Sequence, residues 1–140
     1  MYHKVILVGN LGRDPEMRYT PSGQTVTSFS LATSEKWTGQ DGQHQERTIW
    51  WRVSAWGKLA ETCNEYLKKG RQVLVEGRMN PDPKTGNPRM YTRQDGTAGT
   101  SFEVTAITVK FLGGRAESGG PAGEGVVEAE PPTDEAEIPF

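Results

Sequence analysis

The ten residues RTIWWRVSAW, numbers 47–56, contain three of the four tryptophans of the chain. In a β-strand the side chains alternate between two faces. One face would carry Trp50, Arg52 and Trp56 with two hydroxyl side chains, and the other is apolar from Ile49 to Ala55. The apolar face is typical of a core. The mixed face, with two indoles around a guanidinium, is suited to flat and negatively charged ligands.

Unpaired nucleobases linked by phosphates are ligands of that kind. Each base gains about 1–3 kcal/mol by stacking on an aromatic ring, whatever its identity, and Arg or Lys beside the ring neutralises the phosphate. Trp37 lies at the mouth of a hairpin loop predicted over 37–46, and Tyr91 begins the last predicted hairpin within the basic segment 78–93. The candidate stacking residues are Trp37, Trp50, Trp56 and Tyr91, and the candidate phosphate contacts in these segments are Arg52, Arg78, Arg89 and Arg93.

The same residues also have a purely structural interpretation. Aromatic rings pack under loops, and charged side chains are ordinary solvated surface. The pattern leaves both interpretations open for Trp50 and Trp56, and it favours packing for Tyr91. Trp51 alternates in phase with Ile49 and Val53. We therefore assign Trp51 to the core or to a subunit interface.

The elements that must position these residues are mostly strands. Segments 3–9, 24–33, 47–56 and 71–79 have strand patterns, and 90–112 is typical of a hairpin with a long returning strand. A helix is predicted over 58–70, with an apolar stripe on one face and Gly70 placed to end it. One helix between the third and fourth of five strands predicts an all-β fold, the five-stranded OB-fold Greek-key barrel. A β-sandwich is the alternative, but the lone helix in mid-chain argues against it.

Charge is divided unevenly along the chain. The net charge is -2, yet residues 1–112 contain 15 Lys and Arg against 11 Asp and Glu, whereas residues 113–140 contain one Arg and seven acids. The second segment is rich in Gly and Pro and has few large apolar side chains, so we predict a disordered acidic C-terminal tail. We divide the chain into a domain at 1–112, a linker at 113–133 and a tip at 134–140.

The last residues of the tail combine acids with an apolar group. Ile138, Pro139 and Phe140 follow a run of acids. A pocket rimmed with Arg or Lys on another protein can capture such a segment together with its terminal carboxylate. The alternative is a tail that serves only solubility.

Other chemistries lack the residues they need. His3, His44 and the single Cys63 do not provide a zinc spacing, so we predict neither a metal nor another cofactor. The glycine spacing of a P-loop is missing, and nothing in the sequence favours an enzyme. A single cysteine and the absence of a signal or transit pattern predict an intracellular protein.

Four long motifs occur in order and almost unbroken over residues 1–112. They are KVILVGNLGRDPEMRYTPSGQTV, FSLATSEKW, RTIWWRVSAWGKLAETCNEYLKKG and QVLVEGRM. Together with IPF after acids, they resemble the bacterial single-stranded DNA-binding protein family. The resemblance implies an OB-fold that forms a homotetramer, with single-stranded DNA wrapped around it, in the bacterial cytoplasm and associated with the nucleoid.

The resemblance also implies roles for particular residues. The stacking positions of the family match Trp37, Trp50 and Trp56, and Tyr91 falls where the family often has a tryptophan. Its phosphate-contacting basic residues match Arg52, Lys58 and Lys69. Its tip, which docks onto replication, recombination and repair proteins, corresponds to Glu135, Ala136, Glu137, Ile138, Pro139 and Phe140. We therefore expect sequence-tolerant binding of single-stranded DNA with no bond made or broken.

Two features depart from the pattern of the family. NPDPKTGNPR, at 80–89, looks like an insertion before Tyr91 and is expected to reshape the hairpin there. Ala136 interrupts a tip that is usually more uniformly aspartate, which is expected to weaken docking. Two other classes stay open, namely an OB-fold accessory protein that binds mainly another protein, such as a primosome component, and an RNA-binding OB-fold protein.

Overall fold

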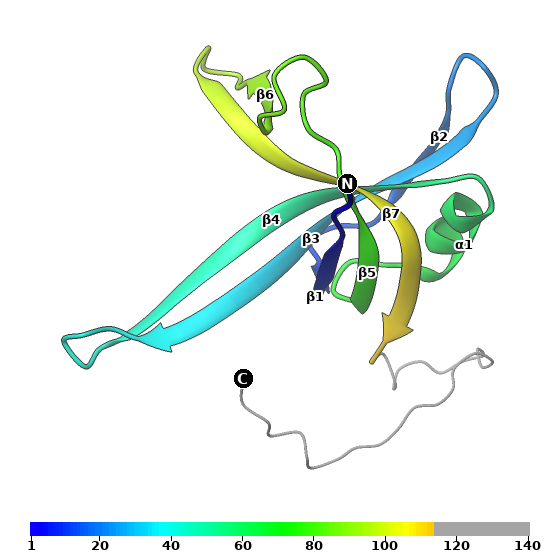
Figure 1. The fold of residues 1–140 in the computed structure, drawn as a ribbon. Coiled ribbons are helices and arrows are strands. Elements are labelled where there is room, and N and C mark those ends of the chain that lie inside the picture. Colours follow the sequence, from blue (N-terminus) through cyan, green and yellow to red (C-terminus); the bar gives the residue numbers. More distant parts are fainter. Residues whose placement is uncertain (114–140) are drawn as a thin grey trace.

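Five long strands close into a barrel in the computed structural model, which describes residues 1–113 (Figure 1). The barrel strands are β1 (Val5–Leu11), β3 (Thr25–Thr38), β4 (His44–Trp56), β5 (Gln72–Met79) and β7 (Ala98–Leu112). Two short strands, β2 (Glu16–Tyr19) and β6 (Arg89–Thr92), pair with β3 and β7, and the helix α1 (Lys58–Tyr66) connects β4 to β5. The predicted tip and, apart from Gly113, the predicted linker lie outside the described residues.

The order of the strands identifies the barrel. The sheet runs β1-β5-β7-β4-β3, and β1 closes it by pairing with β3 at Asn10 and Leu11. The β4–β7 pairing is parallel and the others in the barrel are antiparallel. The helix lies between β4 and β5, which are the third and fourth strands expected from the sequence. The predicted OB-fold is therefore confirmed, and a β-sandwich is not.

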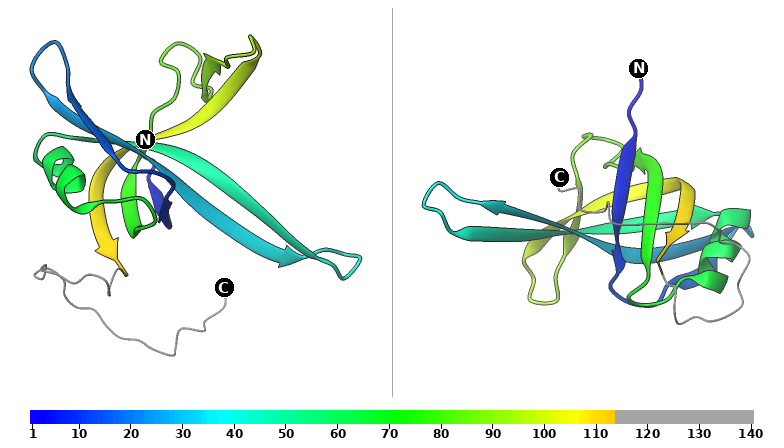
Figure 2. Two further views of the ribbon diagram at one scale, coloured as in Figure 1. Left: turned by 180° about the vertical axis from the view of Figure 1, so that it is seen from behind. Right: turned by 90° about the horizontal axis from the view of Figure 1, so that it is seen from below.

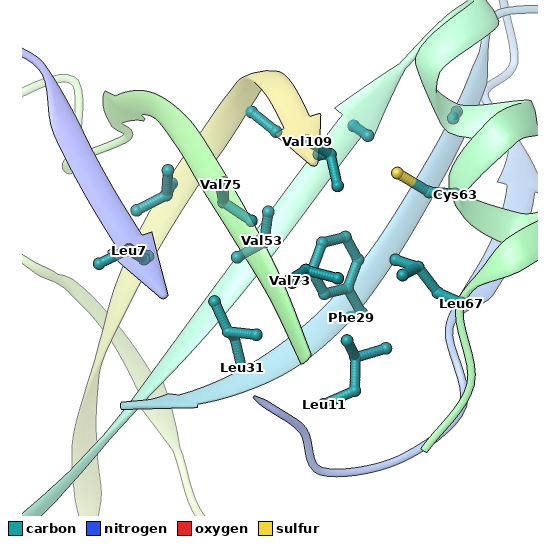
Figure 3. Close-up of a cluster of buried hydrophobic side chains, with 14 residues drawn as sticks. Leu7, Leu11, Phe29, Leu31, Val53, Cys63, Leu67, Val73, Val75 and Val109 are labelled. Carbon is teal, nitrogen blue, oxygen red and sulfur yellow. The ribbon is translucent and has the colours of Figure 1, made fainter. Parts of the chain in front are cut away.

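The core fills the inside of the barrel and continues under the helix (Figure 3). Its largest fully buried side chains include Leu31 and several valines, supplied by the inward positions of the strands. Cys63 and Leu67 reach the same cluster from α1 and the residue that follows it. Thr27 is also buried, and its hydroxyl donates to the carbonyl oxygen of Ala60 across 2.7 Å. This hydrogen bond attaches the helix to β3 without leaving a polar atom unpaired.

The helix is shorter than the sequence predicts. It ends at Tyr66, and Leu67 is already extended, with φ -89° and ψ 149°. The prediction that Gly70 terminates the helix is therefore wrong. The chain after Tyr66 is held by β1 and the loop beyond it, because the Gly70 amide donates to the Leu11 carbonyl and the Lys69 amide donates to Asp14 Oδ1. These tertiary contacts, together with burial of Leu67, outweigh continuation of the helix.

Two hairpins extend beyond the barrel. The β3–β4 hairpin continues as a long two-stranded arm, and its loop covers only 39–43 instead of the predicted 37–46. Ser34 and Glu35 contact Thr48 and Arg47 across the arm, which keeps the strands paired there. The second hairpin consists of β6 and the start of β7, and it follows the loop 80–88, because Arg89, the last residue of NPDPKTGNPR, already belongs to β6. Both hairpins lie on the side of the barrel away from α1 (Figures 1 and 2).

Candidate nucleic-acid interface

Trp50 and Trp56 lie on the outer face of β4. Val53 and Ala55 on the other face are fully buried, so the predicted alternation of this strand is confirmed. Trp50 is 56% exposed and Trp56 is 43% exposed. Each indole is therefore covered over part of its surface and open to solvent over the rest, which is the condition for stacking on a base.

Strand register places Arg78 on the same face as Arg52. Paired residues on neighbouring strands point to the same side of a sheet. Ser54, which alternates in phase with Arg52, pairs with Thr105 of β7, and Thr105 pairs in turn with Arg78 of β5. Both arginines are exposed. The outer face therefore combines two indoles with two guanidinium groups.

A carboxylate lies beside Arg52 on this face. Glu103 of β7 is in register with Arg52, and its Oε2 accepts a hydrogen bond from the Ser101 hydroxyl at 2.8 Å. Within residues 1–113 the ion pairs are Lys4–Glu76 and Arg47–Glu35. None of the predicted phosphate contacts forms an ion pair with a carboxylate among residues 1–113.

Trp37 lies near the end of the β3–β4 arm and is 44% exposed. Its register partner is Gln45, and alternation along β3 and β4 assigns it to the face of Trp51, opposite to that of Trp50. The Arg47 guanidinium lies 5.1 Å from its ring centroid, within the range of a cation–π contact. The structure therefore does not bring Trp37 onto the face of Trp50 and Trp56.

Tyr91 lies on β6 in the second hairpin and is 50% exposed. It is directly opposite Gly99 on β7. The Arg93 guanidinium lies 5.8 Å from the ring centroid and also donates hydrogen bonds to the Ala98 carbonyl and to Thr97 Oγ1. Both the ring and the charge are thus held by their own hairpin.

Arg89 is half-buried at the base of the insertion. Its Nε donates to the carbonyl oxygen of Asn80 and its Nη2 to Asn80 Oδ1, each at 3.4 Å. The insertion is ordered by Asp82, whose Oδ1 accepts the amides of Lys84 at 2.8 Å and Thr85 at 3.1 Å. These amide hydrogen bonds lower the pKa of the Asp82 carboxyl. Arg89 therefore closes the base of an ordered loop, and its guanidinium is less available than that of Arg78.

Lys58 and Lys69 lie at the two ends of the helical segment. Lys58 is the first residue of α1 and is exposed, as is Lys69 after the helix. The backbone of Lys69 is tied to Asp14. Lys69 thus lies beside the loop that follows β1.

The loop after β1 contributes two residues that the sequence patterns did not indicate. Gly12 and Arg13 line an open hollow of about 280 Å³ together with Ser30 and Trp50. The hollow places a guanidinium beside the most exposed of the four tryptophans. A glycine and an arginine in a loop gave no local signal, because their contact with Trp50 depends on how β1 closes the barrel.

The described residues contain no cluster of His, Cys, Asp or Glu that could hold a metal ion. Cys63 is buried, and burial raises the pKa of its thiol to about 11. Across residues 1–113, α1 is too short to span a membrane.

Comparison with known proteins places the chain in a family. Residues 2–112 match the Single-strand binding protein family. The chain is 47% identical over 120 residues to the single-stranded DNA-binding protein of Neisseria meningitidis serogroup A, an alignment that covers 86% of this chain and 65% of that protein. It is 46% identical over 122 residues to single-stranded DNA-binding protein 1 of Chlorobaculum tepidum, covering 84% and 69%. The chain belongs to the single-strand binding protein family.

Solved structures share the fold. A Plasmodium falciparum SSB in complex with ssDNA superposes with a TM-score of 0.66 at 24% identity, covering 81% of this chain and 97% of that one. A deletion mutant of the single-stranded DNA binding protein from Thermus aquaticus gives a TM-score of 0.62 at 31% identity, covering 80% and 51%. The chain therefore spans about two thirds of the length of the Neisseria relative and about half that of the Thermus chain.

Proposed function

We propose that this chain binds single-stranded DNA without strong sequence preference. The observation that carries the proposal is the outer face of β4, where Trp50 and Trp56 are exposed on the same side of the sheet as Arg52 and Arg78. Bases stack on the rings, and the guanidinium groups neutralise phosphates and release counterions. Binding makes and breaks no covalent bond, and its role in the cell is to protect unpaired strands.

Other residues extend the proposed surface. Tyr91 and Arg93 provide a second ring and charge on the β6–β7 hairpin, and Trp37 provides a third site on the arm. Lys58 and Lys69 add charge at the ends of the helical segment, and Arg89 adds charge at the base of the insertion. Arg13 is a new candidate, because it lines the hollow beside Trp50.

The proposal is tested by tryptophan fluorescence during titration with oligo-dT at two salt concentrations. We expect quenching on binding and a fall of affinity with salt, with a log–log slope of about -0.7 per neutralised phosphate. Replacement of Trp50 by alanine is expected to cost about 1–3 kcal/mol of binding free energy. Parent-like affinity of Trp50→Ala would show that the stacking assignment is wrong. A matched RNA oligomer that binds more tightly than the DNA would indicate a different ligand.

A second part of the proposal concerns residues outside the described range. Residues 134–140 would dock onto replication, recombination and repair proteins, with Ile138, Pro139 and Phe140 entering an apolar pocket and the acids contacting its basic rim. The support is the sequence pattern and the membership in the family. The test compares the DNA-bound parent chain with the DNA-bound Phe140→Ala variant. Each is exposed to a bacterial extract, and mass spectrometry identifies the proteins that it retains. We expect Phe140→Ala to lose the DNA replication and repair proteins, and an unchanged set would contradict docking through the tip.

A third part concerns assembly and location. We propose a homotetramer in the bacterial cytoplasm, associated with nucleoid DNA. Ile6 and Val8 on the outer side of β1 are large apolar side chains exposed on a strand that pairs with β3 only at its end. Burial of such side chains against another copy would be favourable. Analytical ultracentrifugation is expected to give four times the chain mass, and a monomer mass at micromolar concentration would contradict assembly.

A further inference from the structure

Two of the proposed stacking rings lie against glycines. A Cβ atom built on Gly12 would lie 2.5 Å from Cζ3 and 2.8 Å from Cη2 of Trp50. A Cβ atom on Gly99 would lie 2.7 Å from Cζ of Tyr91 and 3.0 Å from Cζ of Arg93. Carbon atoms in contact are normally about 3.5–4.0 Å apart. Neither ring could keep its position if the glycine beside it carried even one methyl group.

The two contacts arise in different ways. Gly99 is directly across the β6–β7 ladder from Tyr91. Trp50 lies opposite Ala32 on β3, and its six-membered ring reaches Gly12, the residue that follows β1. Gly12 is held there by its amide, which donates to the Ser30 carbonyl at 3.1 Å. Gly12 after the end of β1 and Gly99 in the β6–β7 hairpin thus each leave room for an exposed aromatic ring.

Backbone conformation does not explain these glycines. Seven glycines among residues 1–113 have positive φ, a region that favours glycine, but Gly12 and Gly99 are not among them. Alanine could adopt either backbone without strain. What the two positions require is space for a ring.

We propose that Gly12 and Gly99 are positioning residues for DNA binding, and this inference rests on the proposed function. Each glycine lets a ring approach the backbone closely, which limits the rotamers available to the side chain, while the ring itself stays about half exposed for a base. A ring ordered before binding loses less entropy when a base stacks on it. Gly12 and Trp50 also line one hollow, together with Arg13 and Ser30.

The experiment compares Gly12→Ala and Gly99→Ala in the full chain by titration with oligo-dT at fixed salt. We expect each to weaken binding about fivefold or more, the effect of losing roughly one weak stack. Gly39→Ala is the matched control, because Gly39 lies in the arm loop and its added Cβ would meet Asp41 Oδ1 at 3.1 Å and no ring. The control is expected to bind like the parent.

Double variants separate positioning from damage to the fold. If Gly12 acts through Trp50, Gly12→Ala added to Trp50→Ala causes no further loss, and Gly99→Ala added to Tyr91→Ala behaves likewise. Trp50→Phe provides a rescue, because the phenyl ring is too short to reach the positions of Cζ3 and Cη2. Gly12→Ala in that background is expected to bind like Trp50→Phe alone.

The outcomes distinguish the inference from the function on which it rests. Parent-like binding by both glycine variants, with weaker binding by Trp50→Ala, overturns the inference and leaves the function in place. An equal loss with and without the ring overturns it as well, because the glycine then acts through the fold. Parent-like binding by both Trp50→Ala and Tyr91→Ala contradicts the function itself. If Gly12→Ala does not fold, the Gly99→Ala variant alone tests the inference, since the hairpin that contains Gly99 lies outside the core.

Discussion

Two adjacent tryptophans show how much depends on a single residue position. Trp50 points outward and is exposed, whereas Trp51 is half-buried, with its Nε1 donating to Thr33 Oγ1 at 2.9 Å. The ring of Trp51 also packs at 5.5 Å from the ring of Phe102. The same side chain therefore serves packing at one position and is available for binding at the next, because side chains alternate along a strand.

This difference predicts opposite phenotypes for two alanine variants. Trp51→Ala is expected to lower the free energy of unfolding by about 2 kcal/mol, less than for a fully buried tryptophan, and to leave oligo-dT affinity within about twofold. Trp50→Ala is expected to weaken binding and to change stability little. Urea unfolding and fluorescence or anisotropy titrations of both variants measure this. Equal effects of the two substitutions on binding would contradict the assignment of faces.

Cys63 predicts a pH dependence of stability. Burial raises the pKa of its thiol to about 11, against an ordinary value of 9.0. The folded state therefore retains a proton that the unfolded state releases, and the stability from this group is complete below pH 9 and is lost as the pH rises to about 11. We expect the parent to lose about 2 kcal/mol more than Cys63→Ala over this range. Identical pH profiles for the two proteins would show that Cys63 is not the cause.

At the scale of elements, the second hairpin differs most from what its sequence suggests. Three prolines in NPDPKTGNPR predict irregular structure, and the loop is irregular but ordered. Asp82 accepts two amides of the loop, its own amide donates to the Asn87 carbonyl, and Arg89 closes the base on Asn80. The segment before β6 therefore has a defined conformation, and it leads directly into β6, the strand that bears Tyr91.

Removal of the Asp82 carboxylate tests whether its hydrogen bonds keep the loop ordered. Asp82→Ala eliminates the acceptor for the amides of Lys84 and Thr85, so the loop is expected to open more often. Trypsin is expected to cut after Lys84 several times faster in the variant, at an unchanged melting temperature, because the loop lies outside the core. Asp41→Ala, which removes a comparable turn acceptor for Gln43 in the other hairpin, is the control. Equal cleavage rates at Lys84 in all three proteins would contradict an ordering role.

At the scale of the whole molecule, the charge is separated along the chain. Residues 1–112 carry an excess of basic side chains, and residues 113–140 carry seven acids and one Arg. Opposite charges on one chain attract each other, and salt screens the attraction over about 10 Å at 0.1 M. We therefore predict that the acidic segment competes weakly for the surface that we propose binds DNA.

Deletion of residues 134–140 is expected to tighten DNA binding at low salt, because it removes Asp134, Glu135 and Glu137. The difference is expected to shrink as salt is added, since screening weakens the competition. Oligo-dT titrations of the parent and the shortened chain at 20 and 300 mM salt measure it. A variant in which the same three acids are replaced by their amides separates charge from length. Weaker binding by the shortened chain would contradict competition.

Much of the fold could be predicted from local patterns. The barrel strands, their order along the chain and the position of the helix follow from alternation and from one apolar stripe, because these periodicities reflect which residues face the core. The short strand β2 was not among the strands expected from the sequence. The lengths of the elements were less predictable. The arm extends because Ser34 and Glu35 find partners on β4, and the helix stops early because its next residues are held by β1 and the loop beyond it.

The residues of the candidate site divide in the same way, into those whose placement local patterns predict and those whose placement depends on tertiary structure. The sequence by itself determined that Trp50, Arg52 and Trp56 share one face, because one strand and its alternation settle that question. Only the tertiary structure decided that this face is exposed, that Arg78 joins it while Trp37 does not, and that Gly12 lies against Trp50. The physical reason is that register and barrel closure depend on pairing between segments far apart in the chain, which no local period encodes.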